Sequence, residues 1–355
     1  MTRKFGTAAI NIALIGCGRI AQTYLEAIAE CSACKLVAIA DVWPQAAKSV
    51  AAQIGCKYFT DYRQVLDGNR VDAVIICTPP NTHHEISLFF LENHIHVLCE
   101  QPFALNTADG LSAVRKAEEK GGLLMVVSQY RYVDDVIRTK NVVESGILGD
   151  IILFENVFCD KINMRNRWNS KKSIAGGGVL IDKGSYSADI AQYLVGPIVK
   201  VRAEERKKCQ SLEVEDTACL YFKTHADITG VVELSWSFYK DRESYIKLFG
   251  TEGVLSVGWA ASKYRHSGEL DWVSFGKGYD KLSSFKRQLA NFIGSIRGEE
   301  FPLITASESL ETVKVIEAAY RSILLDTWIE IDGLQDEVLD PPECQSETPK
   351  ASVRS

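Results

Sequence analysis

The stretch Ile12-Ala13-Leu14-Ile15-Gly16-Cys17-Gly18-Arg19-Ile20-Ala21 decides the fold of the first half of this chain. An apolar run typical of a buried strand enters a glycine-rich turn, and a helical pattern starts directly after it. Gly16 permits the tight turn, Gly18 lets the backbone approach a pyrophosphate, and Ala21 allows close packing of helix on strand. The N–H groups of the helix N-terminus favour phosphates. The stretch therefore predicts the phosphate-binding turn of a dinucleotide-binding domain.

Asp41 strengthens this prediction because it ends the second expected strand, at the expected distance after the glycines. A carboxylate there can accept hydrogen bonds from both hydroxyls of the adenosine ribose, and it would repel a 2′-phosphate. No arginine follows directly, since Val42, Trp43 and Pro44 come next. The sequence therefore favours NAD(H) over NADP(H). The competing interpretation is an ordinary turn in which Asp41 caps a helix.

Around this stretch, short apolar runs alternate with amphipathic segments up to residue 125, which is the pattern of βαβ units. The expected strands are 11–15, 35–41, 73–78, 96–99 and 123–127, and the expected helices are 21–30, 44–54, 84–93 and 108–120. We therefore expect an α/β fold that begins with a Rossmann domain, a doubly wound parallel sheet, over residues 1–128.

The pattern changes in the second half of the chain. The runs 151–158, 217–224, 228–237 and 245–249 resemble antiparallel strands of one larger sheet. An apolar stripe over 307–325 has the spacing of a packed helix. We expect an α/β domain with a large, mostly antiparallel open sheet over residues 129–332, for substrate binding and oligomerisation. The polar composition of residues 333–355 predicts a disordered tail.

Composition argues against several classes of partner. The chain has 355 residues, 46% of them hydrophobic, and a formal net charge of -6 without a long basic stripe, so we expect no nucleic-acid binding. No apolar run approaches the roughly 18 to 20 residues of a membrane span. The ten cysteines are scattered, several within apolar runs, which favours a reducing cytoplasm. Cys31 and Cys34 form a C-x-x-C without a second pair or nearby histidines, so we expect no metal.

Two polar segments follow expected strands of the first sheet. They are Thr78-Pro79-Pro80-Asn81-Thr82-His83 and Glu100-Gln101-Pro102. Ligands of open parallel sheets lie at the carboxyl ends of the strands, so the second segment marks where a nicotinamide ring should lie. The alternative is that both are plain connecting loops in which proline fixes φ. The expected cofactor-binding residues are Gly16, Gly18, Arg19, Ile20, Asp41, Thr78, Pro79, Asn81, His83, Glu100 and Gln101.

With these motifs in order, the chain resembles the Gfo/Idh/MocA family (glucose-fructose oxidoreductase, inositol dehydrogenase, rhizopine catabolism) across about residues 9–330. The resemblance also rests on Gln129-Tyr130-Arg131-Tyr132 and on the glycine-rich segment 175–189, AGGGVLIDKGSYSAD. It implies an NAD-dependent oxidoreductase that acts on a hydroxyl carbon of a sugar, sugar nucleotide or cyclitol. It also implies a homodimer or homotetramer formed through the sheet of the second domain.

The chain departs from this family at two catalytic positions. Gln101 stands where the family's catalytic lysine lies, and Tyr186 stands where its histidine lies, while Asp182 remains. Oxidation of a secondary alcohol needs a group that takes the hydroxyl proton, and an amide cannot. We therefore expect Tyr186 and Asp182 to transfer the proton and Gln101 to donate a hydrogen bond. A cation or the nicotinamide ring could lower the pKa of the Tyr186 phenol enough for this role.

Substrate contacts are expected just before and within the glycine-rich segment. The candidates are Tyr130, Lys161, Arg165, Arg167, Trp168 and Lys183. The two arginines would suit a carboxylate or phosphate on the substrate, although solvated surface charges are the alternative. Lys183 follows Asp182 at a helix start and should point away from it.

Three functions are compatible with these residues. The first is the NAD-dependent oxidoreductase described above, with atypical catalytic residues. The second is a redox-neutral enzyme, of epimerase or lyase type, that retains tightly bound NAD and uses it transiently. The third is a catalytically inactive NAD-binding regulator, because a fold does not prove an activity. The oxidoreductase predicts net production of NADH, and the redox-neutral enzyme predicts product without NADH. The inactive regulator predicts NAD binding without turnover.

Overall fold

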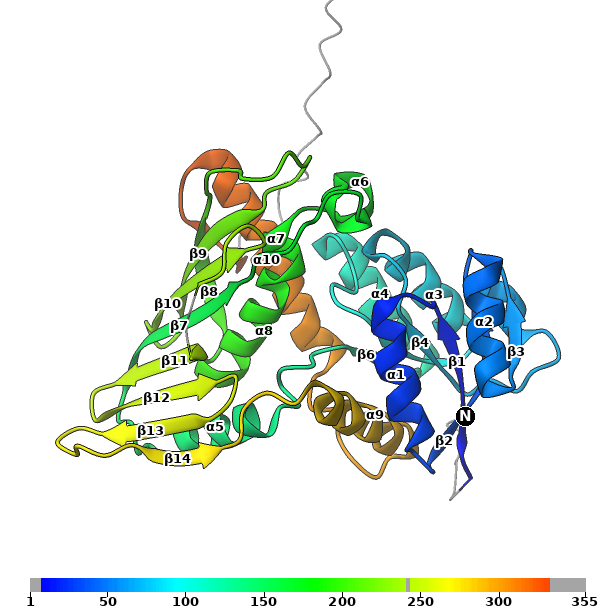
Figure 1. The fold of residues 1–355 in the computed structure, drawn as a ribbon, viewed down its shortest axis with the longest axis horizontal. Coiled ribbons are helices and arrows are strands. Elements are labelled where there is room, and N and C mark those ends of the chain that lie inside the picture. The colour runs from blue at the N-terminus through cyan, green and yellow to red at the C-terminus, as the bar shows by residue number, and fades with distance from the viewer. Residues whose placement is uncertain (1–7, 241–242, 333–355) are drawn as a thin grey trace, which may run out of the picture.

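The computed structural model describes residues 8–240 and 243–332, and its first half is a six-stranded parallel sheet (Figure 1). The strand order is β3-β2-β1-β4-β5-β6, which is that of a Rossmann domain. The strands are β1 (Ile10–Ile15), β2 (Cys34–Ala40), β3 (Lys57–Phe59), β4 (Ala73–Ile76), β5 (His96–Cys99) and β6 (Leu124–Val126). The predicted parallel sheet is confirmed, and the short strand β3 joins it at one edge.

Helices cover both faces of this sheet. They are α1 (Arg19–Ala29), α2 (Pro44–Ile54), α3 (His83–Glu92) and α4 (Thr107–Lys120), with the 3-10 turns η1 (Tyr62–Leu66) and η2 (Pro80–Thr82). Local sequence explains several of their ends. The Asn106 side chain accepts the N–H of Asp109 and caps the start of α4. Gly55 and Gly121 end α2 and α4 in the left-handed conformation that glycine adopts without strain.

The second half is built on a nine-stranded sheet in the order β14-β13-β12-β11-β7-β10-β9-β8-β15. Only the β7–β10 pair is parallel, so the predicted mostly antiparallel sheet is confirmed. The strands are β7 (Ile151–Cys159), β8 (Ile198–Glu205), β9 (Thr217–Thr224), β10 (Thr229–Ser235), β11 (Ser244–Gly250), β12 (Gly253–Gly258), β13 (Ser262–His266), β14 (Val273–Gly276) and β15 (Ile329–Glu330).

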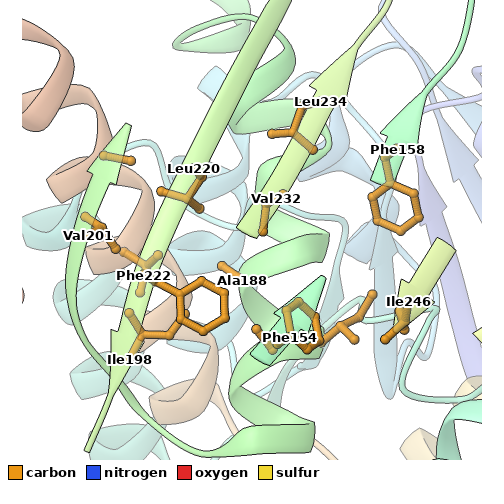
Figure 2. Close-up of a cluster of buried hydrophobic side chains, with 14 of the residues drawn as sticks. Phe154, Phe158, Ala188, Ile198, Val201, Leu220, Phe222, Val232, Leu234 and Ile246 are labelled. Carbon is orange, nitrogen blue, oxygen red and sulfur yellow. The ribbon is translucent and has the colours of Figure 1, made fainter. Parts of the chain in front are cut away.

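The described helices of the second half are α5 (Asp134–Glu144), α6 (Lys172–Ala175), α7 (Val179–Asp182), α8 (Gly184–Val195), α9 (Lys281–Arg297) and α10 (Ala306–Leu325), with η3 (Trp168–Ser170) before α6. Of these, α5, α7, α8 and α10 pack on one face of this sheet, toward the Rossmann domain (Figure 1). Figure 2 shows Ala188 of α8 among Phe154, Phe222 and Val232 of the sheet, all fully buried. Burial of each large apolar side chain stabilises the fold by about 1.5–3 kcal/mol.

Helix α9 packs on the Rossmann half, although it comes late in the chain. Its residues Phe285, Leu289 and Phe292 are buried in one cluster with α1. The Phe285 ring meets the Tyr24 ring edge-on, with their centroids 4.9 Å apart. Helix α9 is absent from our sequence predictions, and the division at residues 128 and 129 stays a prediction. The two halves are therefore tied together by a helix that the division assigns to the second half.

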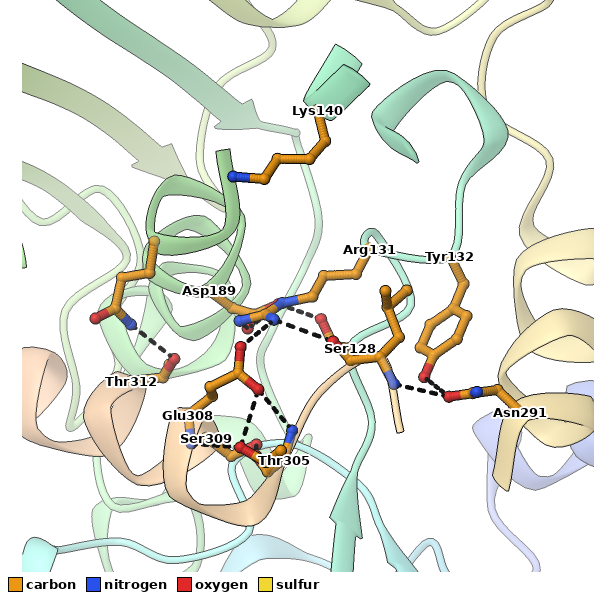
Figure 3. Close-up of polar contacts among 12 residues, drawn as sticks. Ser128, Arg131, Tyr132, Lys140, Asp189, Asn291, Thr305, Glu308, Ser309 and Thr312 are labelled. Carbon is orange, nitrogen blue, oxygen red and sulfur yellow. Dashed lines mark hydrogen bonds and ion pairs between the residues drawn. The ribbon is translucent and has the colours of Figure 1, made fainter. Parts of the chain in front are cut away.

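A buried ion pair anchors the segment by which the chain passes from β6 to α5 (Figure 3). Two nitrogens of Arg131 donate to Asp189 of α8 at 2.9 and 2.8 Å, and Ser128 donates to the same carboxylate. A third nitrogen of Arg131 lies 3.0 Å from Glu308 in the first turn of α10. Because Arg131 and Asp189 are 2% and 1% exposed, this charge pair is shielded from water.

Two further sequence predictions concern membrane-spanning segments and the C-terminal tail. In the described parts of the chain, no helix is long and apolar enough to cross a membrane. The predicted disordered tail, residues 333–355, lies outside the described residues.

Candidate active site

The glycine-rich turn between β1 and α1 has the geometry that a pyrophosphate requires. Gly16 has φ +93°, and a Cβ on it would lie 2.8 Å from the carbonyl carbon of Cys77. A Cβ on Gly18 would meet no described atom within 4 Å, so open space lies in front of this residue. Helix α1 starts directly after Gly18 without a side-chain cap or an acidic residue in its first turn. Its free N–H groups can therefore bind an anion.

Asp41 lies against the same turn. Its carboxylate accepts the backbone N–H of Cys17 at 2.7 Å and that of Trp43 at 2.8 Å. The side chain is only partly buried, and each carboxylate oxygen can accept a further hydrogen bond. The chain thus holds a fixed negative charge beside the turn, as an adenosine ribose with two free hydroxyls requires.

His83 is placed differently from the other predicted cofactor residues. It is 1% exposed, and its Nδ1 and Nε2 lie 2.8 Å from the carbonyl oxygen of Pro102 and 2.7 Å from that of Thr78. The ring therefore braces the loops after β4 and β5 against each other. Thr78 and Pro79 line the first loop, where Thr82 Oγ1 lies 2.8 Å from both Thr78 Oγ1 and the Pro79 carbonyl, and Asn81 is exposed.

Three unsatisfied polar atoms come together at the carboxyl end of β5. Glu100 is 7% exposed, and its Oε2 accepts the Gln101 backbone N–H at 3.3 Å. Among the described residues, Glu100 Oε1, Gln101 Oε1 and the Tyr24 hydroxyl are buried without a well-formed hydrogen bond. Burial raises the pKa of Glu100 to about 7, while the Gln101 N–H, Tyr24 and Lys281 act to lower it. Unsatisfied buried polar atoms are costly, so this group fits a polar ligand such as the nicotinamide end of NAD(H).

Asp182, at the end of α7, is held by two donors from separate elements. Trp236 Nε1 donates to Oδ2 at 3.1 Å, and Asn169 Nδ2 donates to Oδ1 at 3.4 Å. Burial raises the pKa of Asp182, while the charges of Lys183 and Arg19 act to lower it.

Tyr186 lies in the first turn of α8. Burial raises the pKa of its phenol well above the ordinary value, and the charges of Glu100 and Asp182 raise it further. Our expectation of a lowered pKa is therefore not met by the chain itself, because the charged groups that influence Tyr186 are negative. That Gln101, Asp182 and Tyr186 lie in one site stays a prediction, which the electrostatic influence of Asp182 and of Glu100, the neighbour of Gln101, on Tyr186 supports. In that site Tyr186 is a neutral hydrogen-bond donor.

Tyr130 belongs to an aromatic wall of this site. Its ring centroid lies 4.9 Å from that of Phe158, 5.4 Å from that of Tyr279 and 5.6 Å from that of Tyr186. Lys183 does not face Asp182, since its ammonium group donates to Asp160 at 2.7 Å and to two backbone carbonyls. Flat aromatic faces beside hydrogen-bonding groups suit a ring-shaped polar substrate.

The remaining predicted substrate residues lie on the segment that leads to Asn169. Lys161 forms a β-bridge with Ser237, and its side chain is exposed. Arg165 and Trp168 are also exposed, and Arg167 is half-buried. Among the described residues, Lys161, Arg165 and Arg167 form no ion pair. Their role in substrate binding stays a prediction.

Sequence reasoning did not find Trp236, Asn169 and Tyr24. Trp236 lies within the predicted strand 228–237, so its place at a strand end was a usable signal. Asn169 follows directly on Trp168, within the segment already singled out. Tyr24 carries no such signal, since in sequence it is one more residue on the buried face of α1.

Comparisons with known proteins agree with this geometry. Residues 10–128 match the oxidoreductase family with an NAD-binding Rossmann fold, and residues 136–256 match the GFO/IDH/MocA C-terminal domain. A D-apiose dehydrogenase of Paraburkholderia graminis is 23% identical, covering 92% of this chain and 90% of that protein. A scyllo-inositol 2-dehydrogenase (NAD(+)) of Bacillus subtilis is 23% identical, covering 91% and 96%. The structure of the WlbA dehydrogenase of Bordetella pertussis with NADH and UDP-GlcNAcA is 25% identical, with a TM-score of 0.80 and coverage of 91% and 97%.

Proposed function

We propose that this chain, which belongs to the Gfo/Idh/MocA family of NAD-binding oxidoreductases, moves a hydride to or from a hydroxyl-bearing carbon of a sugar, sugar nucleotide or cyclitol. The observation that carries the proposal is the open phosphate turn at Gly18 on one side of a site that holds Asp182 and Tyr186 on the other. Relatives named as dehydrogenases of D-apiose and scyllo-inositol support this class of substrate.

The residues that would hold the cofactor fit NAD(H). The N–H groups after Gly18 would bind the pyrophosphate, Asp41 would accept hydrogen bonds from the ribose hydroxyls, and the loops at Thr78 and Glu100 would hold the nicotinamide end. When bound, NAD⁺ supplies the acceptor for a hydride. The absence of a basic residue beside Asp41 supports NAD(H) over NADP(H), as the sequence predicts.

The chain's own residues would orient the reacting alcohol. Asp182, fixed by Trp236 and Asn169, accepts a hydrogen bond from one substrate hydroxyl. Tyr186 donates a hydrogen bond to the oxygen of the reacting carbon, because its raised pKa keeps it neutral. The Gln101 amide adds a second donor but cannot carry a proton away. The tyrosine wall at Tyr130 packs against the face of the sugar or cyclitol ring.

A redox-neutral reaction is the second candidate, and Gln101 favours it. Without a lysine at this position, the chain lacks the group that makes net alcohol oxidation efficient in the family it belongs to. An enzyme that oxidises a substrate and then reduces the intermediate would produce no net NADH. Tightly bound NAD after purification would support this alternative.

The test is to identify any nucleotide bound to the purified chain and to screen sugars, cyclitols and nucleotide sugars for NADH absorbance and for product. The oxidoreductase predicts NADH in proportion to product. Tyr186→Phe should lower kcat by about 100-fold or more, in the range of acid–base contributions. Tyr193→Phe, on the same helix but beside Arg131, is the matched control and should leave kcat unchanged. Turnover that Tyr186→Phe does not alter would remove that residue from the mechanism.

We further propose a homodimer or homotetramer formed through the second sheet. Helices α5, α7, α8 and α10 lie on one face of this sheet, and Figure 1 shows the other face without a helix over it. A sheet of this size with one bare face favours self-association. Light scattering of the purified chain tests the oligomer.

We also propose a cytoplasmic location, which the nine free cysteines among the described residues support.

A further inference from the structure

Glu215, just before β9, is a buried side chain that the proposed reaction does not use. It is 6% exposed, and its Oε1 accepts the backbone N–H groups of Gly178 and Leu180, each at 3.0 Å. Its backbone carbonyl accepts the N–H of Val179 at 2.9 Å. The first N–H groups of a helix have no partner within that helix. Glu215 therefore binds three successive N–H groups at the start of α7, the helix that ends at Asp182.

The glycine-rich segment before α7 is shaped to approach this carboxylate. A Cβ on Gly178 would overlap the carbonyl oxygen of Glu215, and a Cβ on Gly177 would overlap the hydroxyl of Tyr320 in α10. That hydroxyl donates to Glu215 Oε1 at 2.8 Å and accepts the Gly178 N–H at 3.2 Å. Glycine is needed at both positions because the backbone lies directly against these two side chains. The glycines of this segment thus have a role that requires no contact with substrate.

The residue after Glu215 holds a donor to Asp182. The backbone carbonyl of Asp216 accepts the N–H of Trp236 at 2.8 Å. The indole Nε1 of Trp236 donates to Asp182 Oδ2 at 3.1 Å. The Asp182 N–H in turn donates to the Gly178 carbonyl at 3.0 Å. The dipeptide Glu215-Asp216 therefore holds both the segment that carries the Asp182 carboxylate and the indole that orients it.

We propose that Glu215 is a positioning residue, which fixes the start of α7 and thereby the orientation in which the Asp182 carboxylate accepts a hydrogen bond from the substrate. In this role Glu215 acts through Asp182 and needs no contact with substrate or cofactor. Loss of its bonds would free the start of α7 and turn the carboxylate away from Trp236. A displacement of about 1 Å in an orienting group can cost about 100-fold in rate. This inference rests on the proposed function.

The first experiment needs no substrate. The chain has six tryptophans, so its indole N–H signals in a proton–nitrogen correlation spectrum are few, and Trp236→Phe identifies the signal of Trp236. Asp182→Ala gives the position of that signal without its acceptor. Glu215→Ala should move the signal toward this position. Glu215→Gln keeps an oxygen that can accept the N–H groups of α7, so it should hold the native position. A native signal in Glu215→Ala, or an equal shift in Glu215→Gln, overturns the proposal.

Asp72→Ala is the matched control for lost stability. Asp72 is 2% exposed and accepts the Asn11 backbone N–H at 3.0 Å, at the end of the first sheet opposite the cofactor turn. Both alanine variants should unfold at lower urea concentration, but only Glu215→Ala should move the Trp236 signal. An equal shift in Asp72→Ala overturns the proposal. If Glu215→Ala does not fold, Tyr320→Phe removes one donor to Glu215 and should move the signal in the same direction, and a native signal there overturns the proposal.

The second experiment measures turnover with any sugar, cyclitol or nucleotide sugar that the screen finds. Glu215→Ala should lower kcat about 100-fold and leave the dissociation constant of NAD⁺, measured by calorimetry, unchanged. In an Asp182→Ala background it should lower kcat no further, because it acts through Asp182. Losses that multiply in the double variant overturn the positioning role and leave the proposed function intact. A moved Trp236 signal in a chain that turns over none of these compounds refutes the proposed function and, with it, the catalytic purpose of the positioning.

Discussion

Arg131→Met tests how the segment between β6 and α5 is anchored on α8 and α10. The guanidinium bonds Asp189 at 2.8 and 2.9 Å and Glu308 at 3.0 Å, and it is 2% exposed. Methionine keeps most of the side-chain volume but leaves Asp189, which is 1% exposed, with Ser128 as its hydrogen-bond donor. The substitution therefore creates an unpaired buried charge, while the cavity it leaves is small.

The expected loss follows from the burial of the partner. Removal of one member of a buried ion pair costs about 3–5 kcal/mol, because the remaining charge is not solvated. Urea denaturation, followed by circular dichroism, should show this loss in the free energy of unfolding. The site geometry should suffer as well, because Tyr130 is the neighbour of Arg131 and Tyr186 lies one turn before Asp189 on α8.

Arg202→Met is the matched control. Arg202 bonds Asp326 at 2.9 Å, a similar distance, but that carboxylate is 86% exposed. Exposed pairs contribute about 0–1 kcal/mol, so this variant should unfold close to the native midpoint. If Arg131→Met lost less than about 1 kcal/mol, or no more than Arg202→Met, the junction would not depend on the buried pair.

Three further predictions concern the cofactor turn, pH and the orientation of Asp182. Gly16→Ala should destabilise the fold by about 2 kcal/mol or more, because φ is +93° and the new Cβ would clash with Cys77. Gly18→Ala should change stability by less than about 1 kcal/mol and still abolish NAD⁺ binding. Thermal melts measure the stability of both variants, and calorimetry measures their NAD⁺ binding. Burial raises the pKa of Glu100 to about 7, so its contribution to stability is present below pH 4.5 and is lost as the pH rises toward 7. Glu100→Gln should therefore be more stable than the native chain by roughly 3 kcal/mol at pH 8 and by less than about 1 kcal/mol at pH 5, by urea denaturation at each pH. Trp236→Phe removes the donor to Asp182 and should lower kcat by about tenfold with a smaller change in KM; equal effects on both would assign Trp236 to substrate binding instead.

The sequence predicted the features that lie in continuous stretches of chain. The alternation of apolar runs gave the parallel sheet, and the turn at Gly16 and Gly18 gave its ligand edge, because both depend on residues close in sequence. The replacements at Gln101 and Tyr186 were visible for the same reason. The chemical consequence of these replacements could not be predicted from the sequence, because the pKa of Tyr186 depends on carboxyl groups from other elements of the fold.

Features that depend on packing between distant segments could not be predicted. The Tyr24 hydroxyl meets Glu100 only because α1 lies beside the end of β5 in three dimensions. Helix α9 has a clear apolar stripe, but no pattern in it says that the partner is the Rossmann half. His83 appeared to be a cofactor residue by its position after a strand, and only the fold shows its two bonds to backbone carbonyls.

The central claim is that the turn at Gly18 and the carboxylate of Asp41 make this chain an NAD(H)-binding protein. Calorimetric titration of the nucleotide-free chain with NAD⁺ and with NADP⁺ tests it most directly. The account predicts that NAD⁺ binds at least about tenfold more tightly than NADP⁺, and that Gly18→Ala loses this binding while remaining folded. Equal or tighter binding of NADP⁺, or NAD⁺ binding that Gly18→Ala leaves unchanged, would contradict it.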